Sequence, residues 1–398
     1  MTESQLTAGI QPVVRTCPFS PPEEYRALRE QDPITEVTLP DGIPGWLVTR
    51  YAEVRALLSD TRFSSRRRGI SGGVDRALDE LPEAAPGWFI MMDPPDHTRL
   101  RRLLTGHFTV RRTRELAPAV ERIVTDHLDA MAAQGGPIDL VQAFALPIPS
   151  LVICELLGVP YADREEFQHN SATLLRIDTT VEETRRAQRE MNELITRLAA
   201  EKRARPTGDI LSALAQSGEL TDQELAGVGV LLLAAGHETT ANMIALSTLC
   251  LLRNPEQLAR FRAEPDQADG VVEELLRYLS VIQFGVRRTA SEDIELGGRL
   301  IPKGSTVVAH LPAANRDPEH FTGDPETLDL LRLHQPHLAF GFGIHQCLGQ
   351  QLARLEMQVA LTALFRRFPG LRLAAPVADI PMRDEMIVYG VHELPVTW

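Results

Sequence analysis

The chain has 398 residues, of which 43% are hydrophobic, and its formal net charge is −13. This hydrophobic content is enough for a large packed core, and the negative charge argues against nucleic acid as the main partner. The N-terminus is polar, and the four cysteines have no paired spacing. We therefore expect no signal peptide, no membrane anchor, no disulfide framework and a cytoplasmic location.

Along the chain, strand patterns occur at 34–39 and 46–49, which Pro-Asp-Gly joins into a hairpin, and again at 285–289 and 306–310. Helical patterns fill most of the remainder. They cover 52–59, 97–105, 113–133, 141–157, 163–175, 182–205, 222–252, 255–262, 268–279 and 348–368. This pattern predicts a mainly α protein with a small β-sheet region (α+β), folded as one domain over 1–398.

The longest helical pattern contains Ala-Gly-His-Glu-Thr-Thr at 235–240, after a capping box of Thr221 and Glu224. Gly236 is a poor helix former, so we expect the helix to open locally there. Thr239 can bond a carbonyl one turn back or a ligand. Glu238 next to Thr239 provides an acid and an alcohol, which are the parts of a proton relay. The alternative is an ordinary buried helix with a polar kink.

Leu231, Ala235 and Thr239 fall on one face of this helix, and small Ala235 leaves room there for a ligand. His237 is interpreted as outward-facing or structural. Further along, Glu274-Leu-Leu-Arg277 places opposite charges three residues apart on another helix. On the surface such a pair would contribute at most about 1 kcal/mol.

Cys347 is the most informative residue. It lies in Phe340-Gly-Phe-Gly-Ile-His345-Gln-Cys347-Leu-Gly349. The glycines at 341 and 343 allow a tight turn with N–H groups toward the sulfur. Phe340 can shield the sulfur, His345 can reach an acidic group of a cofactor, and Gly349 lets the next helix start close to the ligand plane. Taken alone, Cys347 could equally be an inert buried thiol.

Together these motifs, in this order, resemble the cytochrome P-450 superfamily of haem-thiolate monooxygenases over nearly the whole chain. The resemblance implies haem b held between the long central helix and the helix after Cys347, with Cys347 as the iron ligand. The link between a thiolate ligand and O–O cleavage is taken from this family itself. Glu238 and Thr239 then match the catalytic acid and alcohol that deliver protons to bound dioxygen, with Ala235 against the haem.

The resemblance also assigns residues around the haem. His97 and Arg101, one helical turn apart after Asp-Pro-Pro-Asp, match contacts to the haem propionates, as do Arg288 and His345. Arg287 is an equal-looking neighbour of Arg288, but strand alternation sends only one of the two inward. In the same family Glu274 and Arg277 lie inside the protein with a third partner, here Arg332, and support folding and the haem loop.

Substrate contacts can be located only through the resemblance. The segments are 68–92, 174–177, 231–235, 280–286 and 386–388, and Ser-Val-Ile-Gln at 280–283 departs from the commoner Ser-Pro-Val. The candidate contacts within them are Phe89, Ile90, Leu231, Leu232, Ile282 and Ile387. Their apolar character suggests a hydrophobic small molecule, either a secondary metabolite such as a macrolide, polyene or terpenoid, or a foreign compound.

No flavin or nicotinamide fingerprint is present, so electrons would come from a ferredoxin and its reductase. Arg102 and Arg354 are candidates for the landing site of that partner, and a solvated helix face is the alternative. We expect a monomer. Two other functions stay open: a peroxide-driven hydroxylase, whose known members lack the acid–alcohol pair, and a non-catalytic haem sensor, which needs no proton relay.

Overall fold

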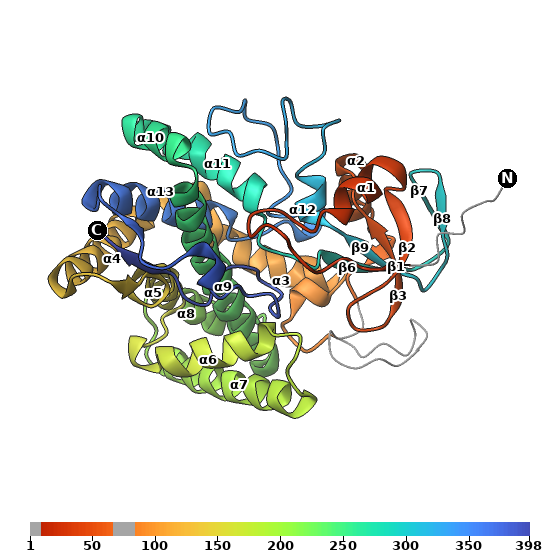
Figure 1. Cartoon of the computed structure of the whole chain (residues 1–398). Coiled ribbons are helices and arrows are strands. Elements are labelled where there is room, and N and C mark those ends of the chain that lie inside the picture. Colours follow the sequence, from red (N-terminus) through yellow and green to blue (C-terminus); the bar gives the residue numbers. More distant parts are fainter. Residues whose placement is uncertain (1–8, 67–83) are drawn as a thin grey trace.

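Most of the long helices lie on one side of the molecule, and the main sheet lies on the other with short helices beside it (Figure 1). The computed structural model describes residues 9–66 and 84–398, so residues 68–83 of the expected substrate segment lie outside it. The α-helices are α1 Glu24–Gln31, α2 Tyr51–Ser59, α3 Asp96–Thr105, α4 Val110–Gln134, α5 Pro147–Leu157, α6 Arg164–Leu175, α7 Val181–Ala204, α8 Ile210–Ser217, α9 Asp222–Arg253, α10 Pro255–Ala263, α11 Ala268–Leu279, α12 Leu311–Ala314 and α13 Gln350–Arg367.

The main sheet has the strand order β1-β2-β3-β9-β6-β4. Its strands are Gly9–Ile10 (β1), Ile34–Thr38 (β2), Pro44–Val48 (β3), Phe63–Ser64 (β4), Val286–Ala290 (β6) and Thr306–Ala309 (β9). The predicted hairpin β2–β3 pairs antiparallel, and β3 pairs in parallel with β9. This pairing brings the two strand regions of the sequence, which lie some 240 residues apart, into one sheet.

Two smaller sheets complete the β structure. One has the order β10-β11-β5, and the other is the pair β7-β8. Their strands are Ile138–Asp139 (β5), Ile294–Leu296 (β7), Arg299–Ile301 (β8), Arg372–Leu373 (β10) and Pro395–Thr397 (β11). These short strands and helices α1, α8 and α12 were not predicted, because segments this short carry little periodicity. The predicted class, mainly α with a small β region, is confirmed.

The predicted helix 141–157 is wrong in one respect, because it consists of two pieces. Val141–Ala145 forms a π-helical segment, and α5 begins only at Pro147. Proline has no N–H to donate to a preceding turn, so it is favoured at a helix start and disfavoured inside one. Both pieces contact α9.

Helix α9 runs through the helical part of the molecule and is buried on almost all sides (Figure 1). It begins with the predicted capping box of Thr221 and Glu224. The expected local opening at Gly236 is wrong, since the helix is continuous from Asp222 to Arg253. A Cβ at Gly236 would lie 2.8 Å from Cδ1 of Ile153 on α5. Glycine is therefore needed for close helix packing, not for a kink. In the described part of the chain, no helix has the length and apolarity needed to cross a membrane.

Candidate active site

The loop before α13 presents Cys347. Gly341 and Gly343 have φ values of +69° and +74°, which residues with a side chain rarely adopt. The N–H of Cys347 donates to the carbonyl of Phe340 at 2.9 Å and closes the loop. A Cβ on Gly343 would lie 2.3 Å from the carbonyl oxygen of Leu58 at the end of α2. Both glycines are thus required, as the sequence predicted.

The surroundings of the Cys347 sulfur are mixed. Its side chain is accessible to solvent although protein atoms surround much of it. Loss of water raises the pKa of this thiol, whereas the backbone N–H of Gly349 and the guanidinium groups of Arg101 and Arg354 act to lower it. Gly349 itself caps the start of α13, and among the described residues beyond its chain neighbours and its own helix backbone, no atom lies within 4 Å of where its Cβ would be. The protein's own packing therefore does not explain why residue 349 is glycine.

Four predicted cofactor-binding side chains converge on this loop. His97 on α3 is buried, and its ring centroid lies 4.1 Å from that of His345. Nη2 of Arg101, one turn further along α3, donates to the carbonyl of Gln346 at 2.6 Å. Arg288 on β6 is buried. Burial, then Arg101, and further Arg288 lower the pKa of His97, while Asp93 raises it, so these charges lie close together.

The choice of Arg288 over Arg287 follows the strand alternation. Arg287 forms an ion pair with Asp41 on the β2–β3 hairpin, on one side of the sheet. Arg288 leaves the strand on the other side and contributes its charge near His97. Sequence reasoning missed Ser65, whose Oγ lies 2.7 Å from Nε2 of His345 and whose N–H donates to Asp93 at 2.7 Å. No pattern in the sequence singles out this serine.

Helix α9 carries a short accessible face within an otherwise buried helix. Ala235 is exposed and Thr239 is half-buried, although the helix around them is packed on all sides. The Thr239 hydroxyl donates to the carbonyl of Ala235 at 3.1 Å, one turn back as expected. His237 is buried rather than outward-facing: Nδ1 donates to the Leu233 carbonyl at 2.7 Å, and its ring packs edge-on against Phe167. Of the two readings of His237, the structural one is correct.

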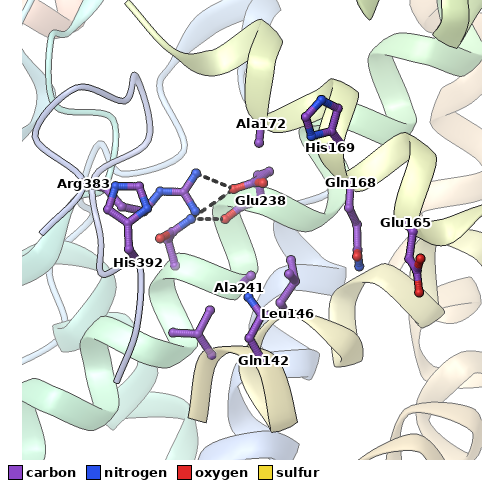
Figure 2. Close-up of a pocket in the computed structure, with 12 residues that line it drawn as sticks. Gln142, Leu146, Glu165, Gln168, His169, Ala172, Glu238, Ala241, Arg383 and His392 are labelled. Atoms are coloured by element: carbon purple, nitrogen blue, oxygen red, sulfur yellow. Dashed lines mark hydrogen bonds and ion pairs between the residues drawn. The ribbon is translucent and has the colours of Figure 1, made fainter. Parts of the chain in front are cut away.

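Glu238 points toward Arg383 (Figure 2). Its carboxylate accepts a hydrogen bond from Nη2 of Arg383 at 2.9 Å, and the two side chains are 4% and 10% exposed. Nδ2 of Asn242 donates to the carbonyl of Glu238 at 2.8 Å and lies 3.3 Å from the same carboxylate oxygen. Asn242 packs tightly on Gly390, where a Cβ would lie 2.0 Å from its Oδ1. Arg383 was missed because it lies 145 residues from Glu238 in the sequence.

A cavity of about 310 Å³ adjoins Glu238 and Arg383 (Figure 2). Its lining includes exposed residues on α6 and on the π-helical segment, while Glu238 and Arg383 lie in its buried part. The lining residues are Val141, Gln142, Leu146, Glu165, Gln168, His169, Ala172, Glu238, Ala241, Asn242, Arg383 and His392. Most of these are polar, so the cavity suits water rather than an apolar ligand. The acid of the expected relay therefore adjoins a polar space.

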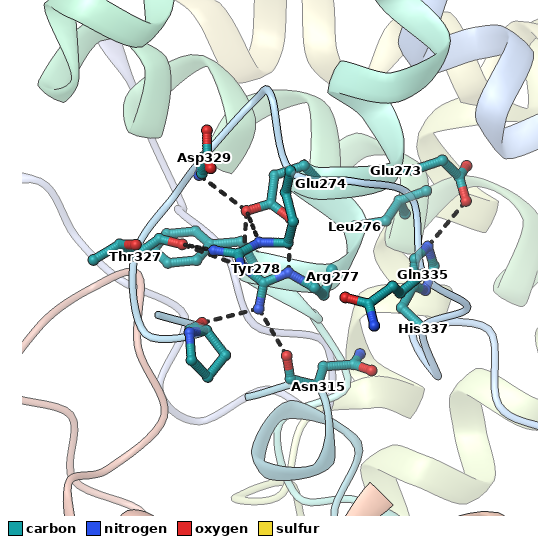
Figure 3. Close-up of polar contacts among 12 residues, drawn as sticks. Glu273, Glu274, Leu276, Arg277, Tyr278, Asn315, Thr327, Asp329, Gln335 and His337 are labelled. Carbon is teal, nitrogen blue, oxygen red and sulfur yellow. Dashed lines mark hydrogen bonds and ion pairs between the residues drawn. The ribbon is translucent and has the colours of Figure 1, made fainter. Parts of the chain in front are cut away.

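The predicted triad of Glu274, Arg277 and Arg332 is assembled and buried. Figure 3 shows Glu274 and Arg277 within it. Arg277 donates to both carboxylate oxygens of Glu274, from Nε to Oε2 at 2.7 Å and from Nη2 to Oε1 at 2.8 Å. Arg332 Nε lies 3.3 Å from Oε1, which also accepts the N–H of Asp329 at 3.0 Å. Because Arg277 donates further to three backbone carbonyls between residues 315 and 327, the triad ties α11 to the segment that leads to Cys347.

A second carboxylate on α11, Glu273, was not predicted. Arg354 on α13 contacts both of its oxygens, with Nη2 3.0 Å from Oε2. Nε2 of His337 lies 3.2 Å from Oε2 (Figure 3). The guanidinium of Arg354 also lies 4.5 Å above the Phe340 ring. Its side chain is only 20% exposed, so Arg354 is a poor candidate for the partner landing site that the sequence suggested.

The predicted substrate residues fall into two groups. Phe89, Leu231 and Leu232 are buried in one apolar cluster, and the Phe89 ring lies 6.3 Å from that of His97. Ile90 is 41% exposed. Ile282 and Ile387 lie on adjoining segments, since Ile282 bridges to Val388 and the N–H of Gln283 lies 3.3 Å from the carbonyl of Ile387. Ile282 packs against a different apolar cluster from the one that contains Phe89.

Comparison with known proteins identifies the family. The sequence profile described as cytochrome P-450 matches residues 46–392. The chain belongs to the cytochrome P-450 family. It is 50% identical to cytochrome P-450-SU2 of Streptomyces griseolus, over 96% of this chain and 94% of that protein. It is 44% identical to the 20-oxo-5-O-mycaminosyltylactone 23-monooxygenase of Streptomyces fradiae, over 97% and 92% of the two chains.

The fold agrees with solved structures of this family. The crystal structure of CYP105P1 in complex with filipin I superposes with a TM-score of 0.93 at 46% identity, covering 98% of this chain and 99% of the other. The protein is thus a cytochrome P-450 monooxygenase, and its family implies a haem-thiolate cofactor.

The residues present suit this cofactor. Both ring nitrogens of buried His97 lack a hydrogen-bond partner within the described part of the protein, and a buried polar group of this kind needs one. The cationic side chains of Arg101 and Arg288 lie near His97, as the two propionate carboxylates of a haem would require. Ala235, exposed on α9, and Gly349, with open space at its Cβ position, provide room for a large flat ring.

Proposed function

We propose that this monooxygenase hydroxylates or epoxidises a hydrophobic small molecule, with electrons from a ferredoxin and its reductase. A secondary metabolite of the macrolide, polyene or terpenoid kind is the favoured substrate class, with foreign compounds as the other. Relatives named for a tylactone and crystallised with filipin I support this class. The apolar cluster of Phe89, Leu231 and Leu232 beside His97 is the observation that carries it here. We further infer one domain over 1–398, working as a cytoplasmic monomer.

In this proposal Cys347 is the sole protein ligand of haem b, and His97, Arg101, Arg288 and His345 hold the propionates. The bound haem supplies dioxygen activation and O–O cleavage. Thr239, on the accessible face of α9, holds a hydroxyl proton within reach of that face. Its bond to Ala235 keeps the hydroxyl in place.

Glu238 supplies protons from the other side of α9. Adjacent residues of a helix do not face each other, so Glu238 and Thr239 communicate through water or through a turn of the Glu238 side chain. The polar cavity at Glu238 is the source of that water. Glu238 and Thr239 together favour the dioxygen-dependent reaction over the peroxide-driven hydroxylase.

The ligand assignment is tested by the reduced protein with carbon monoxide. Wild type is expected to show the red-shifted Soret band of a thiolate-ligated haem, and Cys347→Ser is expected to lose it. Retention of this band in Cys347→Ser would contradict the assignment. Cys154→Ser is the matched control, because Cys154 is buried on α5 and burial raises its pKa to about 12, which keeps it a neutral thiol.

The substrate class is tested by titrating wild type with a panel of macrolides, polyenes and terpenoids. A ligand that enters the site is expected to shift the Soret band by displacing water from the haem. Phe89→Ala is expected to weaken the binding of large apolar ligands because it removes buried apolar surface. If small polar compounds alone shift the band, the proposed class is wrong.

A further inference from the structure

We propose that Glu273 and Arg354 form a charge pair that sets the reduction potential of the haem, with Glu273 as the residue that positions Arg354 beside the ligand loop. The inference rests on the proposed function, because it requires Cys347 to bind the iron. It concerns the side of the ligand loop that faces α11 and α13.

The position of Arg354 is determined by several contacts. It follows Cys347 by seven residues, on the second turn of α13. Both carboxylate oxygens of Glu273 and the side-chain oxygen of Gln350, at 3.0 Å, accept from its guanidinium. One planar face of that group lies 4.5 Å above the Phe340 ring. Arginine is suited to this combination because its rigid fork can bind a carboxylate and stack on a ring at once.

The Glu273–Arg354 pair lies close to the loop that carries Cys347. The ring under Arg354 belongs to Phe340, whose carbonyl accepts the N–H of Cys347 at 2.9 Å. A positive charge on this side of the sulfur therefore stabilises negative charge on the ligand.

Glu273 compensates most of that charge. Burial raises the pKa of Glu273, but its contacts with His337 and Arg354 outweigh burial and bring the pKa to about 2. Glu273 is therefore ionised at neutral pH. The two side chains are only 17% and 20% exposed, so their charges are less screened by solvent than those of a surface pair.

The sign of each effect follows from electrostatics. One-electron reduction of the haem adds one negative charge to the iron–thiolate unit. A nearby cation favours the reduced form and a nearby anion opposes it. Removing the Glu273 charge should raise the reduction potential, and removing the Arg354 charge should lower it. A purely structural pair would not produce opposite signs.

The experiment is a spectroelectrochemical titration of substrate-free holoprotein at one ionic strength. Glu273→Gln is expected to shift the midpoint potential upward, and Arg354→Gln downward. The double variant is expected to return close to wild type. The control is Arg367→Gln on the same helix, where Arg367 is 50% exposed and pairs with Asp129. It changes the net charge equally but lies about 20 Å further along the helix.

Shifts of the same sign in Glu273→Gln and Arg354→Gln would overturn the inference, as would shifts no larger than that of Arg367→Gln. If Arg354→Gln fails to bind haem, Arg354→Lys replaces it. Lysine keeps the charge, so its potential should stay near wild type while Glu273→Gln still shifts upward. Only proteins that show the red-shifted carbon monoxide band are compared. Loss of that band in wild type would instead contradict the proposed function.

Discussion

Glu238 is bound to Arg383, 145 residues further along the chain, and not to its neighbour Thr239. The pair is buried, with Nη2 of Arg383 2.9 Å from the carboxylate, and it adjoins a polar cavity. The acid and the alcohol thus occupy different sides of α9. The ion pair with Arg383 holds the acid at the polar cavity.

Arg383→Gln is therefore expected to destabilise the holoprotein by about 3 kcal/mol, because it leaves the Glu238 carboxylate buried without its cation. The double variant Glu238→Gln/Arg383→Gln should recover most of this loss, since no charge is then left unpaired. Thermal unfolding of the wild type, the single variants Glu238→Gln and Arg383→Gln, and the double variant measures the cycle. Equal destabilisation in the single Arg383 variant and the double variant would show that the ion pair is not the cause.

Thr239→Ala is expected to uncouple the reaction. Its hydroxyl is the accessible polar group next to Ala235, so its loss removes the nearest proton donor. Reductant and oxygen should still be consumed, with more hydrogen peroxide and less product per electron. Thr239→Ser keeps the hydroxyl and should stay close to wild type. If product per electron is unchanged in Thr239→Ala, the threonine is only a structural group in the helix.

Glu274→Ala is expected to give little haem-containing protein. The variant leaves Arg277 and Arg332, which are 2% and 5% exposed, without their shared carboxylate. Breaking a buried pair of this kind costs about 3–5 kcal/mol. Glu30→Ala is the control, because Glu30 pairs with Arg26 on an exposed helix face and should have little effect. The ratio of haem to protein absorbance after purification measures the outcome.

The free energy of unfolding is expected to decrease as the pH is lowered below about 6.5, the ordinary pKa of histidine. His310 contributes to this decrease. Burial lowers the pKa of His310 to about 3, against a rise from its bond to the Gln283 carbonyl. Between these two pKa values the unfolded chain binds a proton that the folded protein does not, so stability decreases as pH decreases. One such group contributes a slope of about 1.4 kcal/mol per pH unit.

His310→Asn tests this origin. Asparagine can still cap α12 in place of Nδ1, which accepts the N–H of Ala313 at 3.1 Å, but it does not titrate. The variant should be less stable at pH 7, and its unfolding free energy should depend less steeply on pH between 4 and 6. An unchanged slope would assign the pH dependence to other groups, such as buried His237.

Arg102 is now the stronger candidate for contact with an acidic ferredoxin. It is 68% exposed on α3, and its ion pair with Glu219 is exposed too. Arg102→Glu should slow reduction by ferredoxin without changing ligand binding, and the difference should shrink as salt rises. Arg26→Glu, equally exposed on α1, is the control. Equal and salt-independent reduction rates in all three proteins would place the docking surface elsewhere.

The sequence alone was sufficient for those parts of the site that depend on local geometry. The glycines at 341 and 343 are required by the turn itself, and Thr239 reaches Ala235 because a helix places a carbonyl four residues back. Glu274 and Arg277 meet for the same reason, one helical turn apart. Resemblance to a family then placed Arg332 with them and chose Arg288. The structure brings Arg332 to Glu274 and the charge of Arg288 near His97.

Only the tertiary structure decided which distant groups complete each local motif. Arg383 reaches Glu238, Ser65 reaches His345, and Glu273 holds Arg354, although no spacing in the sequence relates the members of any of these pairs. Gly236 similarly allows α9 to pack closely against Ile153 on α5, and it does not kink its own helix. Short-range periodicity determines what one element can present to its neighbours. Contacts across the fold depend on how helices and sheet pack as a whole, and this packing determines the charges around the acid and around the thiolate.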